Sequence, residues 1–255
     1  MKTFINKKLL YTSLACFFFS GTQVHAKGQT SDVLLHAETI KTISQDLAKN
    51  YFYIQQGIQT SSAKKGLKKD IITLDDTIRK LQMSATSENT KGIVEFMFFS
   101  VDELKSTIKE TFSAENGGLI LDYTETLLEG SESIAKHNKG KEESMLGVIE
   151  EMQFLLERAS KYYIAFRAGY TDAINVTQAK MAVEKFEILL GKVQAHTYPG
   201  PITTGPIKKL SKYWPVSKNF YLGIKKSELP TIVFISTKHM KRALDKLVEH
   251  HKKTH

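Results

Sequence analysis

Cysteine and proline are both scarce in this chain of 255 residues, and each shortage limits what the protein can be. Cys16 is the single cysteine, so the rest of the chain can hold neither a disulfide nor a covalent c-type haem site. The five prolines are confined to residues 199–230, which leaves the remaining sequence free of their helix-breaking effect. We therefore expect a largely helical fold that is held together by apolar packing.

Sequence motifs of catalysis and metal binding are missing as well. The sequence has no Glu-x-x-His pair, which removes the usual signature of a di-iron bundle, and it has no nucleophile arrangement or glycine-rich phosphate loop. His251 and His255 have i, i+4 spacing, but they lie in a lysine-rich terminal segment where only adventitious metal binding is expected. We therefore expect no enzymatic activity, no functional metal site and no cofactor.

The beginning of the chain has the three parts of a secretory signal peptide. Three lysines precede an apolar stretch at residues 9–19, and a small-residue cleavage site follows at Val24-His25-Ala26. The apolar stretch is too short for a comfortable membrane span, and no later run approaches the ~20 apolar residues that a membrane helix needs. We predict that residues 1–26 are a signal peptide and that the mature chain is a periplasmic protein of a Gram-negative bacterium.

A lipoprotein signal is the alternative, with Cys16 as the acylated residue. Ser13-Leu14-Ala15 is a poor approach to such a cysteine, and the apolar run continues past it. Removal of residues 1–26 takes away three lysines and no acid, which lowers the net charge from +9 to +6. A basic excess of this size attracts anionic lipids or polyanions, or it is simply a solvated surface. Nucleic acid is not an expected partner in this compartment.

Hydrophobic periodicity predicts helices along almost the whole mature chain. Ile40, Ile43, Leu47 and Tyr51, for example, recur at three- and four-residue steps, which places them on one face of a helix. Thr60-Ser61-Ser62 is expected to cap the second helix, and Asn116-Gly117-Gly118 to separate the third from the fourth. The expected helices span residues 31–59, 63–83, 90–113, 118–138, 142–171, 174–195, 207–224 and 228–251.

These eight segments form two copies of a four-helix unit. A shift of 112 residues sets 34–82 on 146–194 without a gap, with eight identical pairs that include Lys49/Lys161. The apolar positions also coincide in this alignment, and a shift of 113 residues extends it to the last helix of each copy. The chain is therefore expected to contain an internal duplication.

Helices that are joined by short connections pack as antiparallel neighbours. We predict an all-α fold of two tandem antiparallel four-helix bundles, residues 27–140 and 141–255. The sequence allows two arrangements of the bundles, because Gly140 lies where the two copies meet and a helix can either continue through a glycine or end at it. A continuous helix through this glycine would stack the bundles end to end, and a break would let them lie side by side.

A cluster of hydrogen-bond donors lies beside the apolar face of the first predicted helix, at Lys41, Ser44, Gln45 and Lys49. The surrounding stretch reads AETIKTISQDLAK and resembles the first helix of the PilJ-type sensor domain, the periplasmic part of the type IV pilus chemotaxis transducer. In that family the stretch reads roughly AGxQRMLSQRMAK. The residues that keep the pattern are Ala37, Ser44, Gln45, Ala48 and Lys49.

The resemblance implies an extracytoplasmic sensor. Some members of the family bind nitrate or related anions, as do the similar sensor modules of the NarX and NarQ kinases, and there the ligand meets arginines on the first helix. Lys41 stands where the family has arginine, which keeps the charge but loses the bidentate geometry that suits an oxyanion. Asp46 replaces a second arginine. In the second copy Gln153, Leu156 and Glu157 occupy the matching positions, so no anion site is expected there.

Two interpretations of the donor cluster are open: Lys41, Ser44, Gln45 and Lys49 line a ligand pocket, or they form a solvated shoulder of the helix. For the function, we expect a periplasmic sensor that binds a small molecule and acts through a membrane-bound receptor. The alternative function is a structural or assembly protein of a pilus, chemosensory or envelope complex that has no small-molecule ligand. The resemblance also implies a homodimer through the first helix.

Aromatic residues at helical spacing are expected in the core. Phe98 and Phe99 are adjacent and cannot both point inward, so one of them is expected to face a partner or the neighbouring bundle. In the second copy, Trp214-Pro215 resembles the tryptophan that often opens the third helix of the PilJ-type domain.

Overall fold

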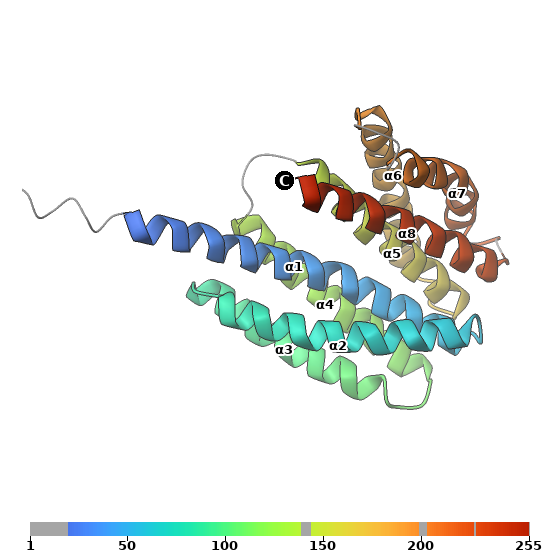
Figure 1. Cartoon of the computed structure of the whole chain (residues 1–255). Coiled ribbons are helices and arrows are strands. Elements are labelled where there is room, and N and C mark those ends of the chain that lie inside the picture. Colours follow the sequence, from blue (N-terminus) through green and yellow to red (C-terminus); the bar gives the residue numbers. More distant parts are fainter. Residues whose placement is uncertain (1–19, 139–143, 199–202, 227, 255) are drawn as a thin grey trace, which may run out of the picture.

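The computed structural model describes residues 20–138, 144–198, 203–226 and 228–254. Every regular element in this part of the chain is an α-helix, which confirms the predicted all-α fold (Figure 1). The helices are α1 Ser20–Gln55, α2 Thr60–Ser84, α3 Glu88–Thr107, α4 Ala114–Asn138, α5 Met145–Arg167, α6 Ala173–Ala195, α7 Thr204–Leu222 and α8 Pro230–Thr254.

Most of the predicted signal peptide, residues 1–19 with Cys16, lies outside the described residues. Residues 20–26 form the beginning of α1, so cleavage after Ala26 would shorten that helix at its N-terminal end. Within the described part of the chain, each helix is too short or too polar to cross a membrane.

Serine side chains cap the N-termini of two helices. Ser87 Oγ accepts a hydrogen bond from Thr90 N at 3.1 Å at the start of α3, and Ser144 Oγ accepts one from Gly147 N at 3.1 Å at the start of α5. Such a cap satisfies a backbone N–H that has no partner within its helix. The predicted cap of the second helix is wrong: α2 begins at Thr60, and Gln59 before it has a φ of 48° and makes no side-chain cap bond.

One further boundary prediction is wrong. Asn116-Gly117-Gly118 lies inside α4, and the chain turns between residues 108 and 113 instead. A side chain at Gly117 would place its Cβ 1.8 Å from the hydroxyl of Tyr170, so this glycine makes room for a neighbour rather than ending a helix. Trp214-Pro215 lies in the middle of α7, where the Trp214 ring packs against Phe186 with centroids 4.1 Å apart.

The helices pack as two antiparallel four-helix bundles, as predicted (Figure 1). In the first bundle, α1 and α3 each pack against α2 and α4; in the second, α5 and α7 each pack against α6 and α8. Paired positions of the duplication hold equivalent core sites, because Ile78 and Leu190, like Leu81 and Val193, are buried. The duplication inferred from sequence therefore corresponds to two copies of one packing pattern.

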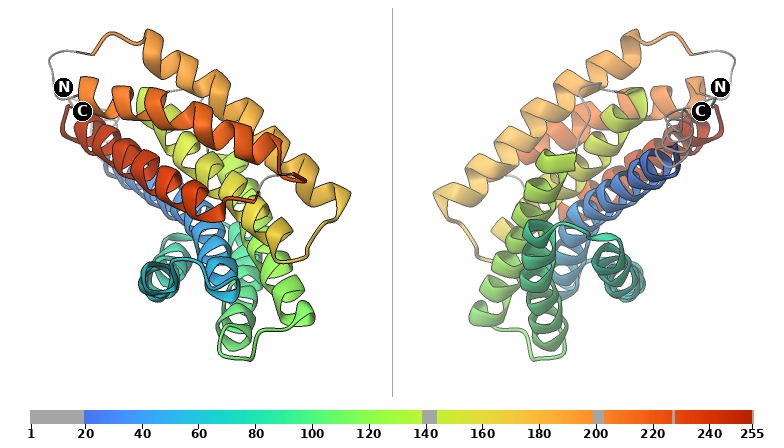
Figure 2. Two further views of the ribbon diagram at one scale, coloured as in Figure 1. Left: turned by 90° about the vertical axis from the view of Figure 1, so that its right-hand side faces the viewer. Right: turned by 90° about the vertical axis from the view of Figure 1, so that its left-hand side faces the viewer.

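The bundles lie side by side, because α1 packs along α5 (Figure 2). Their apolar cores also interlock: Ile164 of α5 and Phe234 of α8 belong to the core of the first bundle, and Leu128 of α4 belongs to that of the second. The predicted boundary between residues 140 and 141 lies outside the described residues. Because α4 ends before this segment and α5 begins after it, the side-by-side arrangement is the one that the chain adopts.

Candidate functional site

The four predicted site residues, Lys41, Ser44, Gln45 and Lys49, lie on the face of α1 that meets α4 and the second bundle. All four are buried; Lys49 is the most exposed of them, at 7%. The solvated-shoulder interpretation is therefore wrong. The reason is that α5 packs along α1 and covers this face, a contact that the local pattern of α1 does not reveal.

These residues belong to a larger polar region that we name the interbundle seam. It contains eleven side chains from four helices: Lys41, Ser44, Gln45, Asp46 and Lys49 of α1, Glu125 of α4, Glu151, Glu157, Arg158 and Lys161 of α5, and Lys241 of α8.

Lys41 is held by carboxylates from both bundles. Its Nζ lies 2.6 Å from Glu151 Oε2 on α5 and 3.6 Å from Glu38 Oε2 on α1, and it lies 4.2 Å from the centroid of the Phe154 ring. Burial raises the pKa of Glu151, but Lys41 and Lys185 outweigh burial and hold that pKa below its ordinary value. The Glu151 carboxylate is therefore ionised at neutral pH.

Lys49 belongs to a closed ring of four alternating charges. Its Nζ lies 2.6 Å from Asp46 Oδ1 and contacts Glu157 Oε2 on α5. Lys241 of α8 closes the ring, because its Nζ contacts Asp46 Oδ2 and lies 2.9 Å from Glu157 Oε1. Each charge has opposite charges on both sides, and their attraction is stronger in the interior than it is in water. The ring joins three helices of the two bundles.

The ring shifts the pKa values of Asp46, Lys49 and Lys241 toward their charged forms. Burial raises the pKa of Asp46, but Lys241 and Lys49 outweigh burial and hold it well below its ordinary value. Burial lowers the pKa of Lys241, yet Asp46 and Glu157 together raise it well above its ordinary value. The same two carboxylates raise the pKa of Lys49 against the effect of burial. All of these groups stay charged through the physiological range.

Ser44 and Gln45 connect α1 with α4 and α5. Ser44 Oγ donates to the carbonyl oxygen of Lys41 at 3.0 Å, and Gln45 Nε2 donates to Ser44 Oγ at 3.1 Å and to the carbonyl oxygen of Thr124 at 3.4 Å. Gln45 Oε1 accepts a hydrogen bond from Arg158 Nη1 at 3.3 Å. Both ends of the Gln45 amide are therefore occupied by groups of the protein.

Arg158 of α5 is the centre of a second polar cluster. Its Nη1 and Nη2 donate to Glu125 Oε1 and Oε2 at 3.0 and 2.9 Å, and Nη2 also donates to Gln178 Oε1 at 2.9 Å. The fully buried Lys161 Nζ contacts the same Glu125 carboxylate and lies 4.3 Å from the centroid of the Tyr162 ring. Burial lowers the pKa of Lys161 to about 8, although Glu125 raises it in part.

Sequence reasoning missed Glu125, Arg158, Lys161 and Lys241. A signal was present in the duplication, because Lys161 is the counterpart of Lys49 and Arg158 is the counterpart of Asp46. Asp46 pairs with α8 of the other bundle, whereas Arg158 pairs with α4 of the other bundle. The equivalent positions 46 and 158 therefore carry opposite charges, and each side chain reaches across the seam.

Asn50 bridges two carboxylates beside the charged ring. Its Nδ2 donates to Asp46 Oδ1 at 3.1 Å and to Asp70 Oδ2 of α2 at 2.8 Å. Burial, together with repulsion by Asp46, raises the pKa of Asp70 to about 7. Among the described residues, no group of three or more His, Cys, Asp or Glu side chains is placed to hold a metal ion.

The seam is suited to holding the bundles together. An anion at Lys41 or Lys49 would have to displace Glu151 or Glu157, which are both in direct contact with these lysines. Glu157 was the residue that made an anion site unexpected in the second copy, and it lies against the predicted site of the first. Ligand binding here would therefore require the two bundles to move apart.

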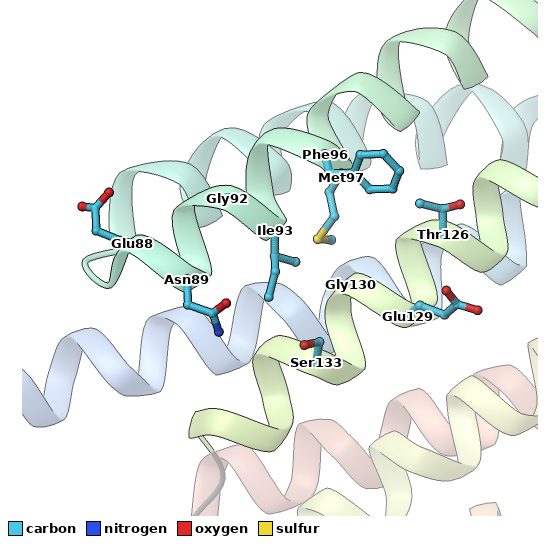
Figure 3. Close-up of a pocket in the computed structure, with 10 residues that line it drawn as sticks. All are labelled: Glu88, Asn89, Gly92, Ile93, Phe96, Met97, Thr126, Glu129, Gly130 and Ser133. Carbon is cyan, nitrogen blue, oxygen red and sulfur yellow. The ribbon is translucent and has the colours of Figure 1, made fainter.

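An open groove of about 510 Å³ lies elsewhere, between α3 and α4 (Figure 3). Ile93 and Met97 of α3 point toward α4, where Gly130 lies opposite them. A Cβ at Gly130 would lie 2.7 Å from Met97 Cγ and Sδ, so the missing side chain allows this contact. The lining residues are Glu88, Asn89, Gly92, Ile93, Phe96, Met97, Thr126, Glu129, Gly130 and Ser133.

Phe96 in the lining of the groove and Phe99 one turn further along α3 both face solvent. Phe96 is 63% exposed and Phe99 is 59% exposed, while Phe98 packs against the first core, with the Arg79 guanidinium 5.9 Å from the centroid of its ring. The prediction that Phe98 and Phe99 cannot both point inward is confirmed. The groove itself was not foreseen, because its residues come from separate helices and form no local motif.

Comparisons with family models, with curated proteins and with solved structures found no match. The resemblance of Ala37–Lys49 to the PilJ-type sensor domain therefore stays a prediction. The seam and the groove are the features from which a function follows.

Proposed function

We propose that this protein is a non-enzymatic assembly module that holds a protein partner on the surface formed by α3 and α4. The proposal rests on the distribution of polar and apolar groups in the protein. The charged groups of the seam are buried or half-buried and paired with one another, whereas the groove between α3 and α4 is open, with exposed Phe96 in its lining and exposed Phe99 one turn along α3. Exposed aromatic side chains beside a groove are typical of protein interaction sites.

The compartment is part of the same proposal. The basic start, the apolar stretch and the small-residue site at Val24-His25-Ala26 favour export to the periplasm. The resemblance of Ala37–Lys49 to the PilJ-type domain favours a pilus or chemosensory complex as the setting. The partner would then be an envelope protein or a membrane-bound receptor.

A capture experiment with matched variants tests this proposal. The tagged protein is expressed in its source bacterium, cross-linked and recovered, in parallel with Phe96→Ser and with Ile188→Ser. Ile188 is an equally exposed apolar residue on α6, at 65%, and serves as the control. We expect one specific envelope protein to be retained by the wild type and by the control and to be lost with Phe96→Ser. Equal capture by all three proteins would contradict the role of the groove.

A small-molecule sensor is the second candidate. It is supported by the convergence of Lys41, Ser44, Gln45 and Lys49 on the seam, where a bound anion would compete with Glu151 and Glu157 and loosen the contact between the bundles. A change in the position of one bundle against the other would then reach a membrane-bound receptor. This function requires a ligand whose binding outweighs the loss of two buried ion pairs.

Thermal unfolding in the presence of nitrate, nitrite, amino acids and carboxylates tests the sensor. A ligand at 100 times its dissociation constant adds about 2.7 kcal/mol to the free energy of unfolding, which raises the melting temperature by several degrees. The same titration with Lys41→Ala should lose the shift. If no compound in the set raises the melting temperature, the sensor is ruled out for these ligand classes, and the assembly module is favoured.

A further inference from the structure

We infer that copies of this chain associate head to tail, with the α3–α4 surface of one copy bound to the α7–α8 hairpin of the next. This inference rests on the proposed function in one respect, because it uses the same groove, and it names a second copy of the chain as the partner.

The two hairpins carry opposite charges. Ten acids and four lysines lie between Glu88 and Asn138, which gives this segment a net charge of −6 in a chain of net charge +9. Three acids and twelve basic residues lie between Thr204 and Thr254, which gives a net charge of +9. Most of these side chains are exposed. Surfaces of opposite sign attract each other and favour one relative orientation.

Each hairpin also exposes apolar side chains among its charges. We name Glu88, Phe96, Phe99 and Glu129 the groove face. We name Leu222, Lys225, Lys226, Leu229 and Ile232, which surround the turn between α7 and α8, the hairpin face. All nine are exposed. Aromatic and aliphatic groups bordered by complementary charges are the composition of a protein–protein contact.

Glu129 of the groove face is available for a partner cation. It lines the groove on α4, and the described residues provide it with no ion pair, whereas Glu88 on the opposite helix pairs with Lys91 at 2.8 Å. Lys225 and Lys226 are both exposed, and no ion pair holds either of them within the described part of the chain. A lysine from the hairpin face of another copy is opposite to Glu129 in charge and can form an ion pair with it. The apolar side chain of Leu229 can pack against the exposed ring of Phe96.

The two faces lie on different bundles of the molecule. Figure 2 shows α3 at the bottom and α7 near the top. Neither α3 nor α4 packs against α7 or α8 in the described structure. One molecule therefore cannot bring its own faces together. An association that uses two different faces leaves one of each kind free at the ends, so it extends into a ring or a filament.

Sedimentation velocity of the purified protein tests this inference. The wild type is expected to form species larger than dimers as its concentration rises, and to do so less at high salt, because salt screens exposed charges. The groove variant combines Phe96→Ser with Glu129→Lys, and the hairpin variant combines Lys225→Gln, Lys226→Gln and Leu229→Ser, because neutral residues there cannot pair with the new lysine of the groove variant. All five positions are exposed, so the fold is expected to remain intact, which circular dichroism checks.

The mixture of the two variants gives the sharpest result. Each variant alone is expected to self-associate roughly tenfold more weakly than the wild type. An equimolar mixture is expected to form dimers and to stop there, because one copy contributes only its hairpin face and the other only its groove face. A control with Ile188→Ser and Glu184→Lys, both exposed on α6, should assemble like the wild type.

Three results would overturn the inference: a wild type that stays monomeric at all concentrations, assembly that both variants leave unchanged, or assembly that ends at a symmetric dimer. These results leave the proposed function separately testable. If the protein is monomeric but Phe96→Ser still abolishes capture of an envelope protein, the assembly module stands with a different partner. If capture and self-association are both insensitive to Phe96→Ser, both proposals fail.

Discussion

At the scale of single residues, Glu157 joins three helices with one carboxylate. It is 1% exposed, and its two oxygens contact Lys49 of α1 and Lys241 of α8. A buried ion pair is costly to break from one side, because the remaining charge keeps its desolvation without its partner. Glu157 is therefore the position at which the charged ring should be most sensitive.

We expect Glu157→Gln to lower the free energy of unfolding by about 3 kcal/mol, since it leaves Lys49 and Lys241 with one carboxylate between them. Urea unfolding measures this loss. Glu184→Gln is the control, because Glu184 is exposed on α6 and its pair with Lys180 at 3.7 Å is solvated, so the expected change is below about 0.5 kcal/mol. Equal effects of the two substitutions would show that the ring contributes no more than a surface pair.

The raised pKa of Asp70 predicts an unusual pH dependence of the free energy of unfolding. Its folded pKa of about 7 exceeds its ordinary value of 3.8, so between these values the folded state binds more protons than the unfolded state does. Its contribution to stability is therefore present below about pH 4 and is lost as the pH rises through 7. Asp46 and Glu125 act in the opposite direction and at lower pH, because their pKa values are lowered and their contribution is lost in acid.

We expect Asp70→Asn to be more stable than the wild type at pH 8, by at least about 1 kcal/mol, and to lose the decline in stability between pH 5 and pH 8. Urea unfolding across this pH range gives the comparison. Asp76→Asn on the same helix is the control, because the Asp76 carboxylate is exposed beside Lys80 and should leave the profile unchanged. A wild type whose stability is flat from pH 5 to pH 8 would contradict the raised pKa.

At the scale of elements, the helix N-termini differ in whether a side chain accepts a hydrogen bond from their free backbone N–H groups. Ser87 caps α3 with a hydrogen bond from its side chain, whereas Asp172 occupies the same position before α6 and makes none. Residue type alone does not distinguish the two, because both serine and aspartate are favoured N-caps. The difference is one of side-chain geometry.

We expect Ser87→Ala to lower the free energy of unfolding by about 1 kcal/mol, through the loss of the bond from Thr90 N. Asp172→Ala should change it by only a few tenths of a kcal/mol, because no cap bond is lost. Chemical denaturation of the two variants beside the wild type decides the matter. A larger effect at Asp172 would reverse the assignment of the caps.

At the scale of the whole molecule, the bundles share both a charged ring and interlocked cores. Ile164 of α5 lies in the core of the first bundle, and Leu128 of α4 lies in that of the second. Domains that share this much buried surface unfold as one cooperative unit. Trp214 is the single tryptophan of the chain and is buried in the second core, so its fluorescence reports that bundle alone.

We therefore expect Leu74→Ala, a substitution in the first core, to shift the unfolding midpoint seen by Trp214 fluorescence. The expected loss is about 3 kcal/mol, because Leu74 is fully buried. Far-UV circular dichroism should give the same midpoint as fluorescence. A fluorescence midpoint that stays at the wild-type value would mean that the bundles unfold independently.

Much of the fold was predictable, because helix periodicity is a local property. Positions such as Ile78 and Leu190 recur at helical spacing and are buried as expected. The donor cluster was found for the same reason, since Lys41 and Lys49 lie on one helix. Its environment was mistaken, because Glu151 and Glu157 lie more than a hundred residues away and nothing near Lys41 indicates them.

The sequence by itself determined the helices, the duplication and the absence of cysteine from the body of the chain, because each depends on residue type and spacing. Only the tertiary structure decided that α1 packs along α5, and with it that Lys41 and Lys49 are buried in ion pairs rather than exposed to a ligand. The physical reason is that burial depends on which surfaces meet. An amphipathic helix with a polar shoulder is compatible with either solvent or a second bundle at that face.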